Sequence, residues 1–198
     1  SQIGEQTPYE GAVSARKQPN ATPIRVNGTA RAAELAFLDP ADLAQAYSQA
    51  RDIGLRHPPG GAGLDRLVDT ARRRAASGEM GAAARWMGEA VTISDAADLW
   101  ADYADYLLRA DSSRSRQRRD YRERAYSAAL NAYLRSDGGG LRVNALSLAA
   151  EALEELGRGR DMLPVLRLAE DIQPRRDVAE MLDDAIAKYG FRVADSTV

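Results

Sequence analysis

The sequence contains no cysteine among its 198 residues. This absence excludes disulfides, thiolate metal ligands and cysteine nucleophiles from the chain. The single histidine, His57, has no second histidine to share a metal, and the adjacent Pro58 and Pro59 favour a loop. A Ser-His-Asp triad would also need this histidine, and no G-x-S-x-G surrounds any serine. We therefore expect no enzyme, no metal site and no cofactor.

Long apolar runs, aromatic residues and lysines are scarce as well. No run of about 18 apolar residues occurs, so no membrane-spanning helix is predicted. Aromatic residues make up 6% and β-branched residues are few, which favours helices packed through alanine over sheets. Lys17 and Lys188 are the only lysines, and all other cations are arginines. The net charge of −2 predicts no strong field toward nucleic acid or acidic lipid.

Residues 1–28 lack a helical period and are punctuated by proline and glycine. They indicate a linker or the tail of a preceding domain, and two N-x-[ST] sequons in this region fit an exposed polar segment. After it, Thr29 is predicted to cap a short helix, Asp39 to cap the next helix, and Gly54 to end it. Asp161 is predicted to cap a helix much further along the chain.

The stretch Leu64–Trp100 contains a helical pattern that recurs later in the chain. Its apolar spacing predicts two antiparallel helices with a tight turn at Gly78, followed by a third helix. A second copy lies at Leu146–Pro174, with its turn at Gly157, 79 positions after Gly78. Aligning the two glycines pairs residues of the same size: Leu67 with Leu146, Ala71 with Ala150, Met87 with Leu166, and Ala90 with Ala169. Tetratricopeptide (TPR) units alternate bulky and small residues at such positions.

Two TPR units of about 34 residues would give an offset of about 68, so the middle unit is longer by roughly 11 residues. The arginine-rich segment Asp111–Arg119 explains most of this excess and predicts an exposed loop and helix start. The sequence therefore predicts an all-α fold over residues 29–190. It would hold about three TPR-like helix pairs, with a capping helix from about Arg176. Residues 191–198 are expected to start a following domain of a longer chain.

A possible interaction surface combines arginines of this segment with two tyrosines: Arg114, Arg116, Arg118, Arg119, Tyr103 and Tyr106. An arginine run can bind phosphate or nucleic acid. Acidic residues interleave with this run, however, and no aromatic stacking pattern accompanies it. We therefore favour docking of an acidic neighbouring domain over binding of nucleic acid. The tyrosines, together with Tyr121 and Tyr133, can line a concave peptide groove or pack between helices, and the sequence leaves both possibilities open.

Three stretches carry a resemblance to a known family: RAAELAFLDPADLAQAYSQARDIGLRHPPGG, DLWADYADYLLRADSS and GRGRDMLPVLRLAEDIQPRRDVAEMLDDAIAKYGFRVADSTV. These three stretches resemble the helical region of bacterial alpha-2-macroglobulin-like proteins, also called large extracellular alpha-helical proteins. In that family a segment similar to YGFRV connects the helical region to the first macroglobulin-type β-sandwich domain. A small PAN/apple-like domain precedes the helical region in some members.

The resemblance implies a periplasmic or cell-surface endopeptidase inhibitor, in which cleavage of a bait region triggers a rearrangement that confines the attacking peptidase. Many members also carry a C-x-E-Q thioester, which a chain without cysteine cannot hold. No bait region and no functional residue can be transferred. We therefore expect a non-catalytic scaffold whose partners are other domains of the same chain and, through the full-length protein, target peptidases. The alternative is a free-standing TPR-like adaptor that binds a partner protein.

Overall fold

The computed structural model describes residues 28–56 and 63–190, and within these ranges it contains nine α-helices, one short 3-10 turn and no strand. The prediction of an all-α fold is confirmed. The predictions made for residues 1–27, for His57 and for residues 191–198 lie outside the described residues. None of the described helices is both long and apolar enough to cross a bilayer.

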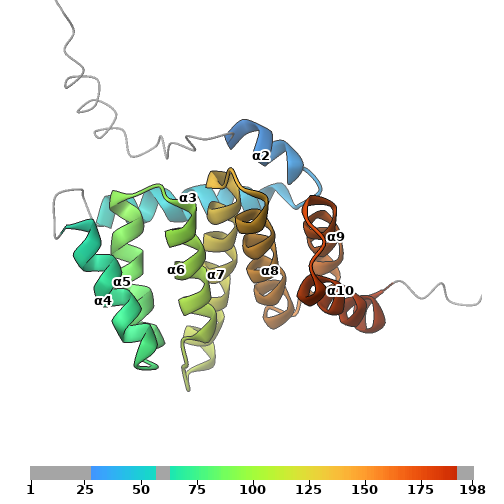
Figure 1. The fold of residues 1–198 in the computed structure, drawn as a ribbon. Helices are drawn as coiled ribbons and strands as arrows, with labels where there is room; N and C mark the ends of the chain where they lie inside the picture. The colour runs from blue at the N-terminus through green and yellow to red at the C-terminus, as the bar shows by residue number, and fades with distance from the viewer. Residues whose placement is uncertain (1–27, 57–62, 191–198) are drawn as a thin grey trace, which may run out of the picture.

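Seven helices form an array in which each helix packs against the next one along the chain (Figure 1). They are α4 (Leu64–Ala76), α5 (Met80–Ile93), α6 (Ala97–Arg109), α7 (Ser115–Arg135), α8 (Gly139–Glu155), α9 (Met162–Ile172) and α10 (Arg176–Tyr189). A 3-10 turn, η1 (Gly159–Asp161), joins α8 to α9. Helix α6 also packs against α8, as the first helices of successive hairpins do in a helical repeat.

The turns between α4 and α5 and between α8 and α9 are built in the same way. Gly78 and Gly157 have φ angles of +77° and +76°. In both turns the glycine N–H donates to the carbonyl three residues earlier, at 2.9 and 3.0 Å. The next N–H donates to the carbonyl five residues earlier, at 2.9 and 2.8 Å. This pair of bonds closes a helix through a left-handed residue, so the repeat predicted from sequence extends to backbone geometry.

Replacing either turn glycine by alanine tests this equivalence. A Cβ at Gly78 or Gly157 would meet no atom within 4 Å, so only the backbone conformation opposes the change. We expect Gly78→Ala and Gly157→Ala each to lower the free energy of unfolding by about 1 kcal/mol, because L-residues disfavour the left-handed region. Urea unfolding of the two variants would measure both losses. A loss at one position alone would contradict the equivalence of the turns.

The eight residues paired by the sequence alignment all lie in the core, and none is more than 3% exposed. Leu67 and Leu146 occupy matching positions on α4 and α8, and both belong to the buried core cluster. The alanines of the set allow close approach of helix backbones because they carry only a methyl group. Size alternation along the sequence therefore predicted the packed face of each hairpin correctly.

The longer middle unit results from a longer helix. Helix α7 has 21 residues, whereas α5 and α9, in the corresponding places, have 14 and 11. The segment predicted to contain a loop and helix start forms a short loop at residues 111–114 and then the first turn of α7. All residues from Ala125 to Arg135 are buried, whereas Ser115–Arg124 is exposed or half-buried. We call Ser115–Arg124 the α7 extension.

Three predicted helix ends differ from those in the structure. Thr29 lies inside helix α2 (Gly28–Glu34) instead of capping it, and α3 (Pro40–Arg56) continues through Gly54. The Asp161 carboxylate accepts a hydrogen bond from the Arg158 guanidinium at 2.8 Å and makes no cap hydrogen bond to α9. Asp39 does act as predicted, because its carboxylate accepts the N–H of Ala41 at 3.0 Å.

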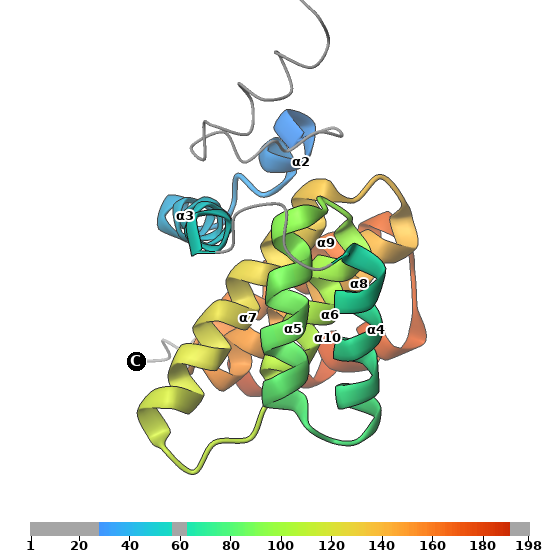
Figure 2. The same ribbon diagram turned by 90° about the vertical axis from the view of Figure 1, so that its left-hand side faces the viewer.

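Helices α2 and α3 lie outside the array. Helix α3 crosses the side of the array formed by α5 and α7 and packs against both helices, while α2 packs against α7 (Figures 1 and 2). Figure 2 shows α3 almost end-on beside the upright helices. The buried half of α7 is therefore surrounded by α6 and α8 from the array and by α2 and α3 from outside it.

Candidate interaction groove

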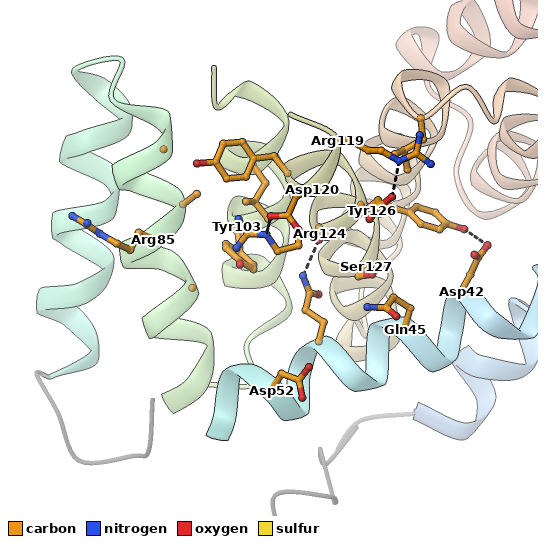
Figure 3. Close-up of a pocket in the computed structure, with 18 of the residues that line it drawn as sticks. Asp42, Gln45, Asp52, Arg85, Tyr103, Arg119, Asp120, Arg124, Tyr126 and Ser127 are labelled. Atoms are coloured by element: carbon orange, nitrogen blue, oxygen red, sulfur yellow. Dashed lines mark hydrogen bonds and ion pairs between the residues drawn. The ribbon is translucent and has the colours of Figure 1, made fainter. Parts of the chain in front are cut away.

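A groove of about 960 Å³ lies between α5 and α7, and α3 forms one of its boundaries (Figure 3). Its floor comes from α6, through Tyr103 and Leu107. Leu156 and Arg158 add to the lining from the end of α8 and the turn that follows. Two of the elements that line the groove, α3 and the α7 extension, are additions to the helix pairs of the repeat.

The α5 wall consists mainly of small residues that share one helical face, Gly81, Ala84 and Gly88. Gly88 has a packing reason, because a Cβ there would lie 3.3 Å from the Tyr103 ring. Gly81 has no such reason, because a Cβ there would meet nothing within 4 Å. Glycine in a helix is usually less stable than alanine, so Gly81 leaves open space beside the groove at a cost in helix stability.

The two wall glycines should respond differently to substitution. We expect Gly81→Ala to raise the free energy of unfolding by about 0.5 kcal/mol, because alanine is the better helix former and its methyl group meets no neighbour. Gly88→Ala should gain less or lose stability, since the Tyr103 ring would have to move. Thermal or urea unfolding would measure the difference. Equal gains at both positions would contradict close packing of Tyr103 on Gly88.

The α7 wall comes from the extension and carries paired charges. Arg119 and Glu123 form an ion pair at 3.0 Å, one helical turn apart. Asp120 and Arg124 form a second pair at 3.1 Å. The Arg124 guanidinium also lies over the Tyr121 ring, 5.2 Å from its centroid. The extra residues of the middle unit therefore build a charged and aromatic wall opposite the small wall of α5.

The α3 boundary is fixed by a partly buried cluster of polar groups. The Asp42 carboxylate accepts a hydrogen bond from the Tyr126 hydroxyl at 2.9 Å and two from the Arg158 guanidinium at 3.0 and 2.8 Å. Burial, followed by the charge and hydrogen bond of Asp42, raises the pKa of Tyr126. The Gln49 amide donates to the Arg124 carbonyl at 2.8 Å. These contacts hold α3 in one position against α7 and the end of α8.

A second polar cluster lies deeper between α3 and α7. Asn131 is fully buried, and its amide donates to the Ala46 carbonyl at 2.9 Å and to Gln49 Oε1 at 3.1 Å. Its own oxygen accepts from Arg135 at 2.8 Å. The Arg135 guanidinium lies 4.9 Å from the centre of the Trp100 ring, and burial lowers the pKa of Arg135. The side chain of Asn131 thus joins α3 to the centre of the array.

Helix α2 is held by a third cluster around Glu34. The Tyr133 hydroxyl donates to its carboxylate, and Arg142 donates at 3.2 Å. Arg31 also donates to Glu34, and its Nε donates to the Ser136 carbonyl at 3.0 Å. Burial and the Glu34 carboxylate together raise the pKa of Tyr133. The hydroxyls with raised pKa values thus serve as hydrogen-bond donors between helices.

Docking of α2 should depend on pH through Glu34. Burial alone would raise its pKa, but hydrogen bonds from Tyr133 and Arg31 and the charges of Arg31 and Arg142 hold it below the ordinary value. A lowered folded-state pKa stabilises the fold above the ordinary glutamate value, and this contribution is lost as pH falls through the folded pKa. The stability advantage of the native chain over Glu34→Gln should therefore shrink from about pH 5 to about pH 3. Urea unfolding of both proteins across this range would measure it, and a constant difference would contradict it.

The arginines predicted from the sequence occupy different places on the α7 extension and the loop before it. Arg119 lines the groove. Arg114 and Arg116 are exposed and have no ion-pair partner in the described part of the chain. Arg118 turns back and donates twice to the Ser112 carbonyl, at 3.2 and 2.7 Å. The structure therefore brings only one of the four arginines to the groove itself.

The two predicted tyrosines are buried. Tyr103 is 4% exposed and forms part of the groove floor, and Tyr106 is 8% exposed. Burial and the nearby Asp102 raise the pKa of Tyr106. Neither ring lies open on the surface. Tyr106 packs between helices, which is one of the two possibilities that the sequence left open. Tyr103 packs between helices and also borders the groove.

The polar groups that hold α3 in place were missed by reasoning from sequence. Asn131 carried one usable signal, since it is an amide in the middle of an alanine- and leucine-rich run, SAALNAYL. Buried amides need hydrogen-bond partners, so this position pointed to a contact outside the array. Asp42 gave no such signal, because an acidic residue in the first turn of a helix is common.

Comparisons with protein-family models, with curated proteins and with solved structures find no match for the chain. Across residues 28–56 and 63–190, no group of three or more histidine, cysteine, aspartate or glutamate side chains is placed to hold a metal ion. The groove must be interpreted from its own chemistry. Protein–protein interfaces are enriched in aromatic residues and arginine, and three tyrosines and four arginines line this groove.

Proposed function

We propose that the chain is a non-catalytic helical scaffold and docking region of an alpha-2-macroglobulin-like endopeptidase inhibitor that acts in the periplasm or at the cell surface. The family resemblance of the three quoted stretches supports this proposal. The structural role of two tyrosines supports the non-catalytic part of the proposal. The tyrosines with raised pKa values, Tyr126 and Tyr133, donate to carboxylates that fasten α2 and α3 to the array.

The observation that carries the scaffold part of the proposal is the placement of α3. Repeat arrays bury their own apolar faces by stacking, and an additional crossing helix is not required for this. Here α3 is held by Asp42, Gln49 and Asn131, and together with the α7 extension it bounds a groove. A surface built in this way suits recognition of another polypeptide segment. In the proposed inhibitor, that segment belongs to another domain or to a partner.

The reading frame of the gene tests the proposal most cheaply. We expect the coding sequence to continue beyond the codon for Val198 into β-sandwich domains, with or without a C-x-E-Q thioester. Sequencing the gene on the 3′ side of that codon gives the answer. A stop codon soon after Val198 would contradict the proposal.

The second candidate is a free-standing TPR-like adaptor, and the groove is the observation that favours it. Under this alternative the described array with α2 and α3 would be the whole functional unit. Binding of a partner through the groove would then be its only activity. The same sequencing separates the two candidates, since the adaptor predicts the stop codon that the inhibitor excludes.

A further inference from the structure

We propose that α2 and α3 form an exchangeable arm, and that two copies of the chain pair by docking each arm on the array of the other copy. The arm comprises residues 28–56, and the array comprises α4 to α10. The occupant of the docking surface is therefore α3 of a second copy. This inference goes beyond the proposed function, because it concerns self-association, and it applies to an inhibitor region and to an adaptor alike.

The array has a continuous packing order without the arm. Its seven helices pack in chain order, each against the next, and neither α2 nor α3 takes a place in that order (Figure 1). The main packing partners of α3 are α5 and α7, rather than α4, which follows α3 in the chain. Such contacts do not depend on which copy supplies the arm, so an exchanged arm would regain them.

Polar contacts make the docking surface specific for this arm. Asp42 accepts two hydrogen bonds from Arg158 and one from Tyr126, and only 11% of the Asp42 side chain is exposed. On the same helix, the side chain of Gln49 accepts a hydrogen bond from the buried Asn131. A surface matched to α3 in charge and hydrogen bonding favours a second α3 over an unrelated helix.

Apolar residues of the arm give a detached arm a reason to dock again. Leu35 and Ala46 are fully buried, and Leu38 and Ala50 are nearly so. Detachment would expose these side chains together with the array surface beneath them, at a cost that grows with the exposed apolar area. Two detached copies remove this cost by docking on each other, because both surfaces are then buried again. The exchanged pair is therefore more stable than two open monomers.

Exchange would also make the groove a shared site. Asp42 and Gln49 of its lining come from the arm, whereas Tyr103 and Arg119 come from the array. Each groove of an exchanged dimer would therefore combine residues of two copies. Only residues 57–63 connect α3 to α4, so the two arrays would lie close together.

Charge reversal at the arm contact tests the inference on the full chain. Asp42→Arg and Arg158→Asp each place like charges at this contact, so amide hydrogen exchange of residues 40–56 should become at least about tenfold faster in either variant alone. A heterodimer of the two variants has opposite charges at both contacts, native at one and reversed at the other. An equimolar mixture should therefore form a heterodimer in native mass spectrometry, with exchange of residues 40–56 within about twofold of the native rate.

The absence of a heterodimer would overturn the inference, and so would pairing of each variant with itself to the same extent. The double variant Asp42→Arg/Arg158→Asp is the matched control, because it carries the reversed pair in one chain. It should recover the slow exchange of residues 40–56. Failure to recover would also contradict the inference, because this contact would then not control docking of the arm.

Arg66→Asp controls for attraction by net charge. Arg66 is exposed on α4, away from the arm contact, and its replacement changes the charge of the chain by the same amount as Arg158→Asp. A mixture of Asp42→Arg with Arg66→Asp should give no heterodimer. Heterodimer at an equal level in this mixture would overturn the inference. The result is independent of the reading frame beyond Val198, so failure here and failure of the proposed inhibitor role can be told apart.

Discussion

Replacing Leu146 with alanine is expected to lower the free energy of unfolding by about 3–4 kcal/mol. Leu146 is fully buried on α8, and α8 packs against α6, α7 and α9. A helix enclosed on several sides cannot move far to fill the cavity that the substitution creates, so both the lost apolar contact and the cavity contribute. Urea unfolding monitored by circular dichroism measures the loss.

Leu67→Ala at the equivalent position of α4 is the internal control. Leu67 is almost as deeply buried, but α4 stands at the end of the array and packs chiefly against α5. The end helix can shift toward the vacated space, and it can also unfold locally without the rest. We expect a loss of about 2 kcal/mol. A larger loss at Leu67 than at Leu146 would contradict an array whose interior hairpins carry most of the stability.

Asn131→Ala is expected to cost about 2–4 kcal/mol and to loosen α3 selectively. The substitution removes the donor that serves Ala46 and Gln49 and the acceptor that serves Arg135. These partners are buried or half-buried and would lose hydrogen bonds without gaining water, which is the expensive case. Amide hydrogen exchange along residues 40–56 should become faster, while the exchange of α8 and α9 should change little.

Ser127→Ala provides the control on the same helix. Ser127 lies one turn before Asn131, and its hydroxyl has no hydrogen-bond partner within the described ranges. We expect a change of less than about 0.5 kcal/mol and unaltered exchange in α3. Unchanged protection of α3 in Asn131→Ala would contradict a polar attachment of that helix.

The helical hairpins could be predicted from the sequence because their signals are local. Helical spacing of apolar residues and a glycine at each turn act within one or two helices, and Gly78 and Gly157 had matching surroundings in the sequence. The crossing of α3 could not be predicted in this way. Its polar contacts join residues 75 to 116 positions apart, as in Gln49 with Arg124 and Asp42 with Arg158. No periodicity records such a pairing of polar side chains.

The candidate site was predictable only in part. The arginine run marked Arg119, because it exceeds what the repeat requires, but the opposite wall depends on packing between α5 and α7. Gly81 looked like one more small residue of a helix until the structure showed the empty space beside it. Tyr106 shows the converse difficulty, since a tyrosine at core spacing gives the same pattern whether it packs inside or faces a groove.

The inhibitor role can be measured on the protein encoded by the complete gene. After incubation of that protein with trypsin, we expect the peptidase to keep hydrolysing a small amide substrate while its hydrolysis of casein falls sharply. Confinement predicts this difference, because a small substrate can still reach an enclosed active site and a large protein cannot. Casein hydrolysis at the full rate, with the gene product merely degraded, would contradict the proposed role.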